Sequence, residues 1–467
     1  MKYRSLAKKT VRNKKFFLIM GLFFAVIMSG CSLIEKTGID LNFVQGTKDI
    51  SGDSVMEPTT KTPESPLLGS LSEGALSNTA VADTNTPTET AEPTPTVYSL
   101  ELWVPPQFDT EQDTASGKAL SEAIKAYVEE NPNVTISLRV KATSGDSSML
   151  NTIISASHIA PDVLPSMALI SRNDMETAVQ RGLLQPVTTT AFSDISTWNS
   201  FARQSSVIDN TIYSIPIFGD DLVITYRKSR TGTDLGDWAD ILGRGMPIGF
   251  APSSSSSLFA AFVYLSMGGK LTNDQGQPYL DQQKLTETLN FFLTGGQNGS
   301  FPPSIAQMVD QTQVWQRFNE GTLSIIISPF SSFRHYQNSD ITMHPIPLSD
   351  LINDYPLVNT WNLVLLEDDS AVQEEAIKFA EYLSSISVND QLSYKAGYLP
   401  VRNGAHEAWA DDPQQEDVIM MSENAALIPN NQIINKLAPI INSAVSQVIK
   451  NQATPEDAAK DAIANLN

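Results

Sequence analysis

The chain of 467 residues contains a single cysteine, Cys31. One thiol can form neither an intrachain disulfide nor a cysteine-based zinc site. Packing and hydrogen bonds alone must therefore hold every folded part of the chain. The position of Cys31 is also informative, because it directly follows an apolar run and two small residues.

The first thirty residues show the three zones of a secretory signal. Seven basic and no acidic residues lie in positions 1–15, and the apolar stretch Phe16–Met28 follows. This stretch is shorter than the roughly 20 residues that a membrane span needs. The run Met28–Cys31 resembles the bacterial lipobox, with Met in place of the commoner Leu. The resemblance implies cleavage before Cys31 and a lipid anchor on its sulfur; an uncleaved helical anchor is the alternative.

The chain is strongly acidic, with a formal net charge of −21 at pH 7. The seven basic residues of the signal are lost on cleavage, which leaves a chain of charge −28. A protein that binds nucleic acid needs a basic face for the phosphates, so nucleic acid is not an expected partner. The acidity suits a soluble domain kept away from the anionic membrane surface by a tether.

Residues 31–96 have the composition of a linker. From about Ser51 they are rich in Thr, Pro, Ser, Glu and Gly, and Phe43 is their only aromatic residue. Such a segment cannot bury enough apolar surface to offset its chain entropy. Residues 97–467 are more than one hydrophobic core usually carries, so we expect two lobes.

Alternating strand and helix patterns open the globular part. Strands are expected at Tyr98–Val104 and Val134–Val140, with a helix at Ala115–Glu130 between them. A helix near Ser147–Ala156 and a short strand at Asp162–Leu164 follow. This order predicts a parallel sheet with crossover helices. Further strands are expected at Ile212–Ile217, Leu222–Tyr226, Leu323–Ile327 and Asn362–Leu366, and further helices at Ser257–Met267, Gln283–Thr294, Ala371–Ser384, Ile433–Lys450 and Pro455–Asn465.

Nine short motifs along residues 97–467 occur in a characteristic order. They are the strand with Trp103 that leads to Asn131–Val140, then Pro161–Val163, Gly182–Pro186, Tyr213–Phe218, Leu222–Lys228, Phe318–Thr322, Glu375–Phe379, Gly397–Arg402 and Thr454–Ala458. In this order they resemble the solute-binding lipoproteins of ABC importers, in the family that includes maltose- and oligosaccharide-binding proteins.

The resemblance implies an α/β fold of the two-lobed, type II periplasmic-binding-protein kind, with a ligand cleft between lobes that crossing segments join. The crossings are expected near Pro216–Phe218, Leu357–Trp361 and Gly397–Tyr398. The first lobe would comprise about 97–215 and 361–396, and the second about 218–356 and 398–467.

The same resemblance implies a monomer on the extracytoplasmic face of the membrane, anchored by lipid, that captures a sugar and delivers it to an ABC permease. A non-sugar solute such as a polyamine, a glycerol phosphate or a peptide is an alternative ligand. A sensory or adhesive lipoprotein with the same fold is an alternative role.

Sugar clefts combine aromatic rings, which stack on a pyranose, with polar groups that bind its hydroxyls. For each expected aromatic residue the alternative is core packing, and for the two aspartates it is the solvation or capping of a turn. The residues that the resemblance brings to the cleft are Trp103, Ser166, Asp220, Asp221, Phe330, Trp361 and Tyr398.

Enzyme motifs are missing from the sequence. There is no Gly-x-Ser-x-Gly elbow, no His-Glu-x-x-His and no phosphate loop, so we expect a binding protein that needs no cofactor. A secreted glycosidase, which needs only two carboxylates, is the enzymatic alternative.

Three local signals favour structural roles. The four histidines lack metal-ligand spacing. The segment Thr272–Gly276 lacks the acids of a calcium loop, which favours a hairpin turn. The serine run Ser253–Ser257 is expected to cap a helix, with ligand contact as the alternative.

Overall fold

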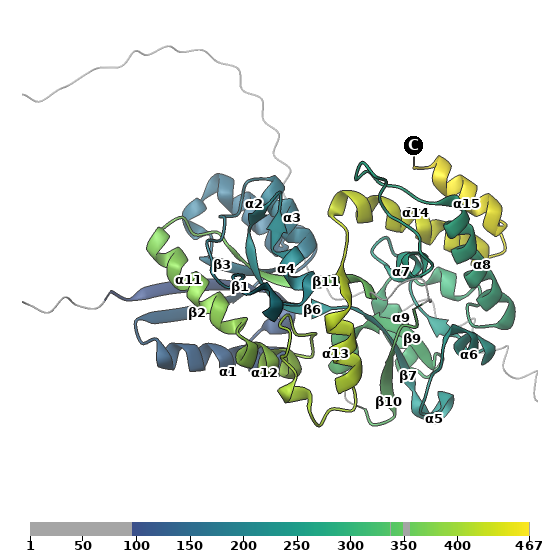
Figure 1. The fold of residues 1–467 in the computed structure, drawn as a ribbon, viewed down its shortest axis with the longest axis horizontal. Helices are drawn as coiled ribbons and strands as arrows, with labels where there is room; N and C mark the ends of the chain where they lie inside the picture. Colours follow the sequence, from purple (N-terminus) through teal and green to yellow (C-terminus); the bar gives the residue numbers. More distant parts are fainter. Residues whose placement is uncertain (1–95, 337, 349–354, 467) are drawn as a thin grey trace, which may run out of the picture. The chain divides into compact units, whose positions relative to one another are not determined.

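The computed structural model describes residues 96–466 apart from 337 and 349–354. The signal, Cys31 and the linker up to residue 95 lie outside the described residues. The described chain builds two main β-sheets, each covered by helices (Figure 1). Within this part of the chain, no helix is both long and apolar enough to cross a membrane.

The first sheet has the strand order β12-β11-β3-β1-β2, with β6 also paired to β11. β1 is parallel to both β2 and β3, as the sequence predicted. β11 runs antiparallel to β3 and β6, which makes the sheet mixed. Its strands are β1 (Tyr98–Val104), β2 (Val134–Val140), β3 (Met167–Ser171), β6 (Ser214–Asp220), β11 (Tyr355–Leu365) and β12 (Ala425–Leu427).

Capped helices accompany the first sheet. The side chain of Thr114 accepts a hydrogen bond from the backbone N of Gly117, and Ser148 caps the next helix in the same way. Both caps satisfy donors that a helix leaves free in its first turn. The helices are α1 (Ala115–Glu130), α2 (Met149–Ile159), α3 (Arg172–Gln180), α4 (Ser200–Ser205), α11 (Ser370–Leu383) and α12 (Ile386–Ala396).

The second sheet has the order β10-β7-β9-β8, with β7 antiparallel to both of its neighbours. Its strands are β7 (Leu222–Arg227), β8 (Ile248–Gly249), β9 (Ile325–Pro329) and β10 (Ile341–Pro345). The accompanying helices are α5 (Lys228–Thr231), α6 (Trp238–Gly243), α7 (Phe259–Ser266), α8 (Gln282–Asn298), α9 (Gln311–Asn319), α10 (Phe330–Arg334), α13 (Gln415–Glu423), α14 (Asn431–Ile449) and α15 (Pro455–Ala464). Short elements complete the fold, the hairpin β4 (Val207–Ile208) and β5 (Thr211–Ile212) and five 3-10 turns, Pro106–Phe108, Pro161–Val163, Ile195–Thr197, Ile305–Gln307 and Glu407–Trp409.

Two strands bring the sheets together. β6 ends at Asp220 in the first sheet, and β7 begins at Leu222 in the second. β11 lies beside β6, with Asn359 opposite Asp220. Figure 1 shows β6 and β11 between the helices of the first sheet and the strands of the second. The junction is therefore built from segments about 140 positions apart in the sequence.

Two local predictions have clear outcomes. The strand expected at Asp162–Leu164 is wrong, because this segment forms a 3-10 turn and the strand β3 begins only at Met167. Pro161 and Pro165 lack the N–H that a central strand donates, which explains why the strand begins only after Pro165. The hairpin turn expected at Thr272–Gly276 is confirmed by a bridge from Thr272 to Pro278, with Gly276 at φ +73°.

The residues after α12 stay beside the first sheet. Leu399 exchanges two backbone hydrogen bonds with Gly219 of β6, at 2.8 and 2.9 Å. The backbone N of Asn199 donates to the carbonyl of Val401. Contact with α10, beside the second sheet, begins at Gly397, which lies against Arg334, and continues to Asp412, which pairs with Arg334 at 2.7 Å. The lobe boundary expected at Gly397–Tyr398 stays a prediction.

Candidate functional site

Asp220 and Asp221 occupy the junction between the sheets. The carboxylate of Asp220 accepts hydrogen bonds from the backbone N and the hydroxyl of Ser331, at 3.0 and 2.6 Å. The backbone N of Phe330 donates to the carbonyl of Asp221 at 2.8 Å. The start of α10 is therefore tied directly to the end of β6.

Burial governs the chemistry of this pair. The residue Asp221 is 2% exposed. Its Oδ1 accepts from the backbone N of Leu222 at 2.7 Å, while its Oδ2 has no partner among the described residues. Loss of water raises the pKa of Asp221 to about 8, and the charge of Asp220 adds to the rise. Burial also raises the pKa of Asp220 to about 6, against the hydrogen bonds from Ser331.

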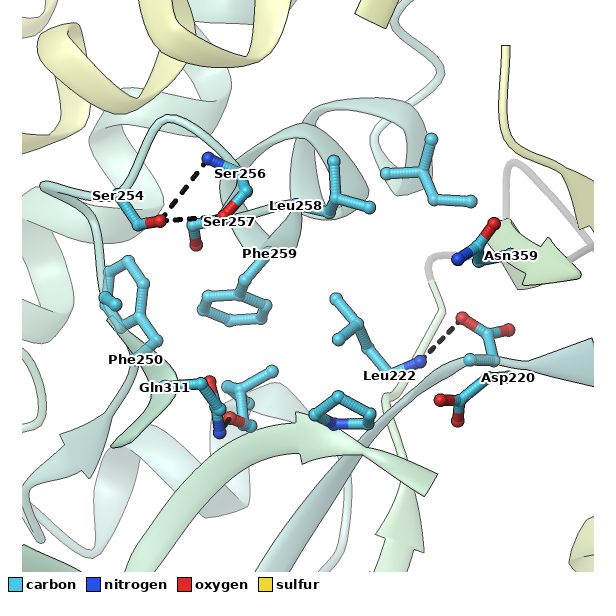
Figure 2. A pocket seen from close by; sticks show the side chains of 15 residues that line it. Asp220, Leu222, Phe250, Ser254, Ser256, Ser257, Leu258, Phe259, Gln311 and Asn359 are labelled. Carbon is cyan, nitrogen blue, oxygen red and sulfur yellow. Dashed lines mark hydrogen bonds between the residues drawn. The ribbon is translucent and has the colours of Figure 1, made fainter. Parts of the chain in front are cut away.

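A cavity of about 230 Å³ opens beside these aspartates, and we call it the acidic cavity (Figure 2). It is bounded by the junction, by β9, by the loop before α7 and by the first part of β11. Its lining residues are Asp220, Asp221, Leu222, Phe250, Ala251, Ser254, Ser256, Ser257, Leu258, Phe259, Gln311, Ile327, Pro329, Leu357 and Asn359.

The acidic cavity has an aromatic end and a polar end. Figure 2 shows Phe250 and Phe259 on one side, with Asp220 and Asn359 on the other. The amide oxygen of Asn359 is buried and has no hydrogen-bond partner among the described residues. Phe250 and Phe259 are each only 1% exposed, so the accessible apolar lining includes the half-buried Leu222 and Leu258. Asp221 and Asn359 bring acceptor atoms to the lining.

The serine run contributes side chains to this cavity. The prediction that it caps a helix is wrong, because the residue at the N-cap of α7 is Leu258 and no side chain caps this helix. Ser254, Ser256 and Ser257 line the cavity instead. Ser254 and Ser256 share a hydrogen bond of 2.9 Å between their hydroxyls. These groups can donate or accept, so they can adapt to a ligand.

A second hollow of about 450 Å³, which we call the aromatic groove, lies on the other side of α10. Trp315 and Tyr336 stack there with ring centroids 5.1 Å apart. His335 Nε2 lies 2.8 Å from the hydroxyl of Ser116, which joins α10 to the start of α1. The lining residues are Gln107, Thr114, Trp315, Asn319, Ser331, Ser332, His335, Tyr336 and Tyr398.

The structure places three of the expected site residues at these hollows. Asp220 and Asp221 line the acidic cavity, and Tyr398 lines the aromatic groove. Trp361 is half-buried beside them, with its ring 6.2 Å from that of Phe108 in an edge arrangement. Tyr398 packs on the same Phe108 ring at 5.6 Å.

Like Trp361, the other three expected residues line neither hollow. Trp103 is 1% exposed within a separate core cluster, and its ring nitrogen donates to Glu101 at 2.7 Å. Ser166 is buried and accepts from the backbone N of Glu101. Phe330 is fully buried and packs against Trp409. Their surroundings favour the alternative of core packing.

Sequence reasoning missed several lining residues. Asn359 lies inside the crossing expected at Leu357–Trp361, but the same strand also contains the polar residues Thr360 and Asn362, so polarity alone does not single it out. Phe250, Phe259 and Gln311 carried no distinguishing signal either, since nothing local separates a lining aromatic residue from a core one. The described residues contain no group of three or more side chains suited to hold a metal ion.

The two-sheet architecture with a junction site defines the class of two-lobed α/β binding folds. The model of the family described as bacterial extracellular solute-binding protein matches residues 122–420. The chain belongs to this family, whose members act outside the cytoplasm.

Solved structures share the fold at low sequence identity. A cyclic alpha-maltosyl-1,6-maltose binding protein from Arthrobacter globiformis matches with a TM-score of 0.65 and 13% identity, over 79% of this chain and 98% of that one. The maltose-binding protein MalE of Listeria monocytogenes, solved with maltose, gives 0.64 and 15%, over 79% and 96%. The GacH receptor of Streptomyces glaucescens, solved with and without acarbose, gives 0.61 and 16%, over 78% and 96%.

Proposed function

We propose that this protein binds a sugar or oligosaccharide where its two sheets meet and delivers it to an ABC permease. The observation that carries the proposal is the acidic cavity, whose lining combines apolar and aromatic side chains with the carboxyl groups of Asp220 and Asp221 and with serine hydroxyls. Aromatic rings stack on the apolar face of a pyranose, and buried polar groups bind its hydroxyls. The ligands in the solved structures of this fold, maltose and acarbose among them, support the same class.

The proposed mechanism is a shift between open and closed forms. The Asp220–Ser331 and Ser116–His335 hydrogen bonds connect elements of the first sheet to α10. A ligand that contacts both sides stabilises the form in which these contacts are made. The closed form would then dock on the permease.

A thermal-shift screen of the full chain against sugars, with polyamines, amino acids and phosphate esters as controls, tests the ligand class. A ligand at 100 times its Kd adds about 2.7 kcal/mol to the free energy of unfolding. A rise in Tm with a sugar series supports the proposal. A rise with a control compound alone would overturn the saccharide assignment.

The membrane anchor is a separate part of the proposal. Cys31, with its lipobox-like neighbours, would carry the lipid, and the acidic linker would hold the binding domain away from the membrane. In a bacterial host, Cys31→Ser should release the protein from the membrane fraction, and Ser32→Ala should not. Retention of the Cys31→Ser protein would favour the uncleaved helical anchor.

We also propose that the protein is not an enzyme, and incubation with chromogenic glycosides tests this directly. Hydrolysis that is lost in Asp220→Asn or Asp221→Asn would establish a glycosidase. A sensory or adhesive lipoprotein is the second candidate role. Uptake of the bound sugar that depends on this protein in intact cells would favour transport over that role.

A further inference from the structure

Two residues that line the acidic cavity each have a buried acceptor atom that no described residue hydrogen-bonds. These atoms are Oδ2 of Asp221 and Oδ1 of Asn359. β6 and β11 bring them close together, because Asn359 pairs with Asp220, the neighbour of Asp221. Buried acceptors without partners cost free energy, and a ligand that donates to them recovers it.

The cavity offers no positive charge to balance these acceptors. None of its described lining residues is Lys, Arg or His. The carboxylate of Asp220 accepts two hydrogen bonds from Ser331. It adds negative charge to the cavity and gives Asp221 no hydrogen-bond donor. Burial raises the pKa of the nearby Tyr355 to about 12, and the charges of Asp417 and Asp221 add to the rise. The surroundings are therefore negative and favour a cation.

We propose that the acidic cavity binds a sugar that carries a protonated amine, and that this ammonium group donates hydrogen bonds to Asp221 and Asn359. The inference rests on the proposed function and narrows its ligand class to amino sugars. An ammonium brings donors and no acceptor, and its positive charge stabilises the ionised form of Asp221, which releases its proton when the ammonium binds. A neutral hydroxyl can supply a donor but not the charge.

The size and the opposite wall of the cavity fit one sugar ring. Its volume of about 230 Å³ lies below the range of roughly 300–1,000 Å³ that is usual for larger ligands. The half-buried Leu222 and Leu258, next to the buried rings of Phe250 and Phe259, provide an apolar surface for the ring. A ring held there can point an amino substituent toward Asp221 and Asn359.

The test is isothermal titration of the full chain at pH 7 with matched sugar pairs. Glucosamine, galactosamine and mannosamine are each compared with the neutral parent sugar and with the N-acetyl derivative, and putrescine is a non-sugar amine. The expected result is that at least one amino sugar binds at least tenfold more tightly than both of its neutral counterparts. A neutral sugar that binds as tightly as its amino form would overturn this inference and leave the proposed function standing.

Two other outcomes separate the inference from the proposed function. If putrescine binds and no sugar does, the saccharide class and the amino-sugar proposal are both overturned. The cavity would then be a site for a non-sugar amine. If none of these compounds binds, the amino-sugar inference and the proposed binding of a single sugar ring are both overturned.

Substitution supplies the second readout. Asp221→Asn keeps the shape and the bond to Leu222 but removes the carboxyl group that can ionise beside a bound ammonium, so it should weaken amino-sugar binding at least tenfold. The same change should weaken the binding of a neutral sugar by a smaller factor than that of the amino sugar. Asp237→Asn, at the exposed N-cap of α6, is the matched control and should alter neither affinity. Equal losses for amino and neutral sugars in Asp221→Asn would contradict a charge-specific role.

Discussion

Ser331 donates two hydrogen bonds to the carboxylate of Asp220, one from its backbone N at 3.0 Å and one from its hydroxyl at 2.6 Å. This pair fastens the start of α10 to the last residue of β6. It also leaves Asp221, one residue further along, without an equivalent donor for its Oδ2. The two adjacent aspartates therefore differ in their hydrogen bonds. Asp220 is bonded to Ser331, whereas Oδ2 of Asp221 has no partner among the described residues.

The first prediction concerns this fastening. Ser331→Ala removes the hydroxyl bond from a buried carboxylate, which should lower the free energy of unfolding by about 1.5–3 kcal/mol. Ser332→Ala, at the next position of the same helix, should change it by less than about 0.5 kcal/mol. Urea unfolding at pH 7 measures both values. Equal stability of the two variants would show that the hydroxyl bond contributes nothing.

The second prediction is a fall in stability as pH rises. The pKa of Asp221 is raised to about 8 and that of Asp220 to about 6, both above the ordinary value of 3.8. Both groups hold a proton in the folded chain at pH values where the unfolded chain has lost it. Their contribution is full below about pH 4 and is lost as pH rises through 6 and then 8.

Asp221→Asn tests the upper part of this range, in which the neighbouring titratable groups are Asp220, Tyr355 and Asp417. The variant should lose less stability than the wild type between pH 6 and 9, by at least about 1.4 kcal/mol, the equivalent of one pKa unit. Urea unfolding across this range supplies the measurement. A wild type that gains stability over the same range, or a variant with the same slope, would contradict the raised pKa.

The predictable parts of this structure were those that local sequence determines. The helix Ala115–Glu130 has the predicted bounds, because apolar spacing places it and Asn131-Pro132 ends it. β1 and β2 also have the predicted bounds, since alternation and β-branched residues specify strands locally. The resemblance to a known family then supplied Asp220 and Asp221 as site residues.

The remainder depended on contacts between distant segments. Trp103 lies at the expected end of β1, yet its ring enters a core cluster with Met149 and Ile153, and the sequence does not reveal which face that is. The strand pattern did not predict the first residues of β11. In this part Leu357 has φ +72° and the pairing of β11 with β12 shifts its register between Tyr355 and Val358, so the strand is irregular there. The acidic cavity exists only where β11 meets β6, so Asn359 could not be recognised before that pairing was known.

The third prediction concerns Gly397, which follows α12 with φ +73°. A Cβ at this position would lie 2.7 Å from the Cβ of Arg334 on α10. Gly397→Ala should therefore cost the strain of a positive φ, about 1–2 kcal/mol, together with a displacement of α10. Gly404→Ala is the control, because its φ of +84° is equally unfavourable while its Cβ meets nothing within 4 Å.

Chemical unfolding of the two variants separates strain from steric contact. Gly397→Ala should be less stable than Gly404→Ala by at least about 1 kcal/mol, since overpacking usually costs 1–3 kcal/mol. It should also weaken solute binding, because α10 carries Ser331, which bonds Asp220 of the acidic cavity. If the two variants are equally stable, α10 moves away from the added methyl group without a loss in the free energy of unfolding.

The last prediction concerns a buried ion pair that connects α3 to the start of α14. Arg172 Nε lies 2.9 Å from Glu176 Oε1, and the two side chains are only 9% and 4% exposed. Glu176 Oε2 accepts from the backbone N of Asn431 at 2.7 Å, and Arg172 also donates to the carbonyl of Ser205. The pair thus holds three segments together at a place that water does not reach.

Removal of one partner leaves the other charge buried without a counterion, and this sets the expected loss in the free energy of unfolding. Glu176→Gln should lower the free energy of unfolding by about 3–5 kcal/mol, because Arg172 keeps its charge without a counterion. Glu374→Gln removes an exposed partner of Lys378 and should cost less than about 1 kcal/mol. Glu176 also holds the N-terminus of α14 through Asn431, so the Glu176→Gln variant should expose the amides there to faster hydrogen exchange. A loss as small as that of Glu374→Gln would mean that water or a neighbouring carbonyl compensates Arg172, and that the connection between α3 and α14 lies elsewhere.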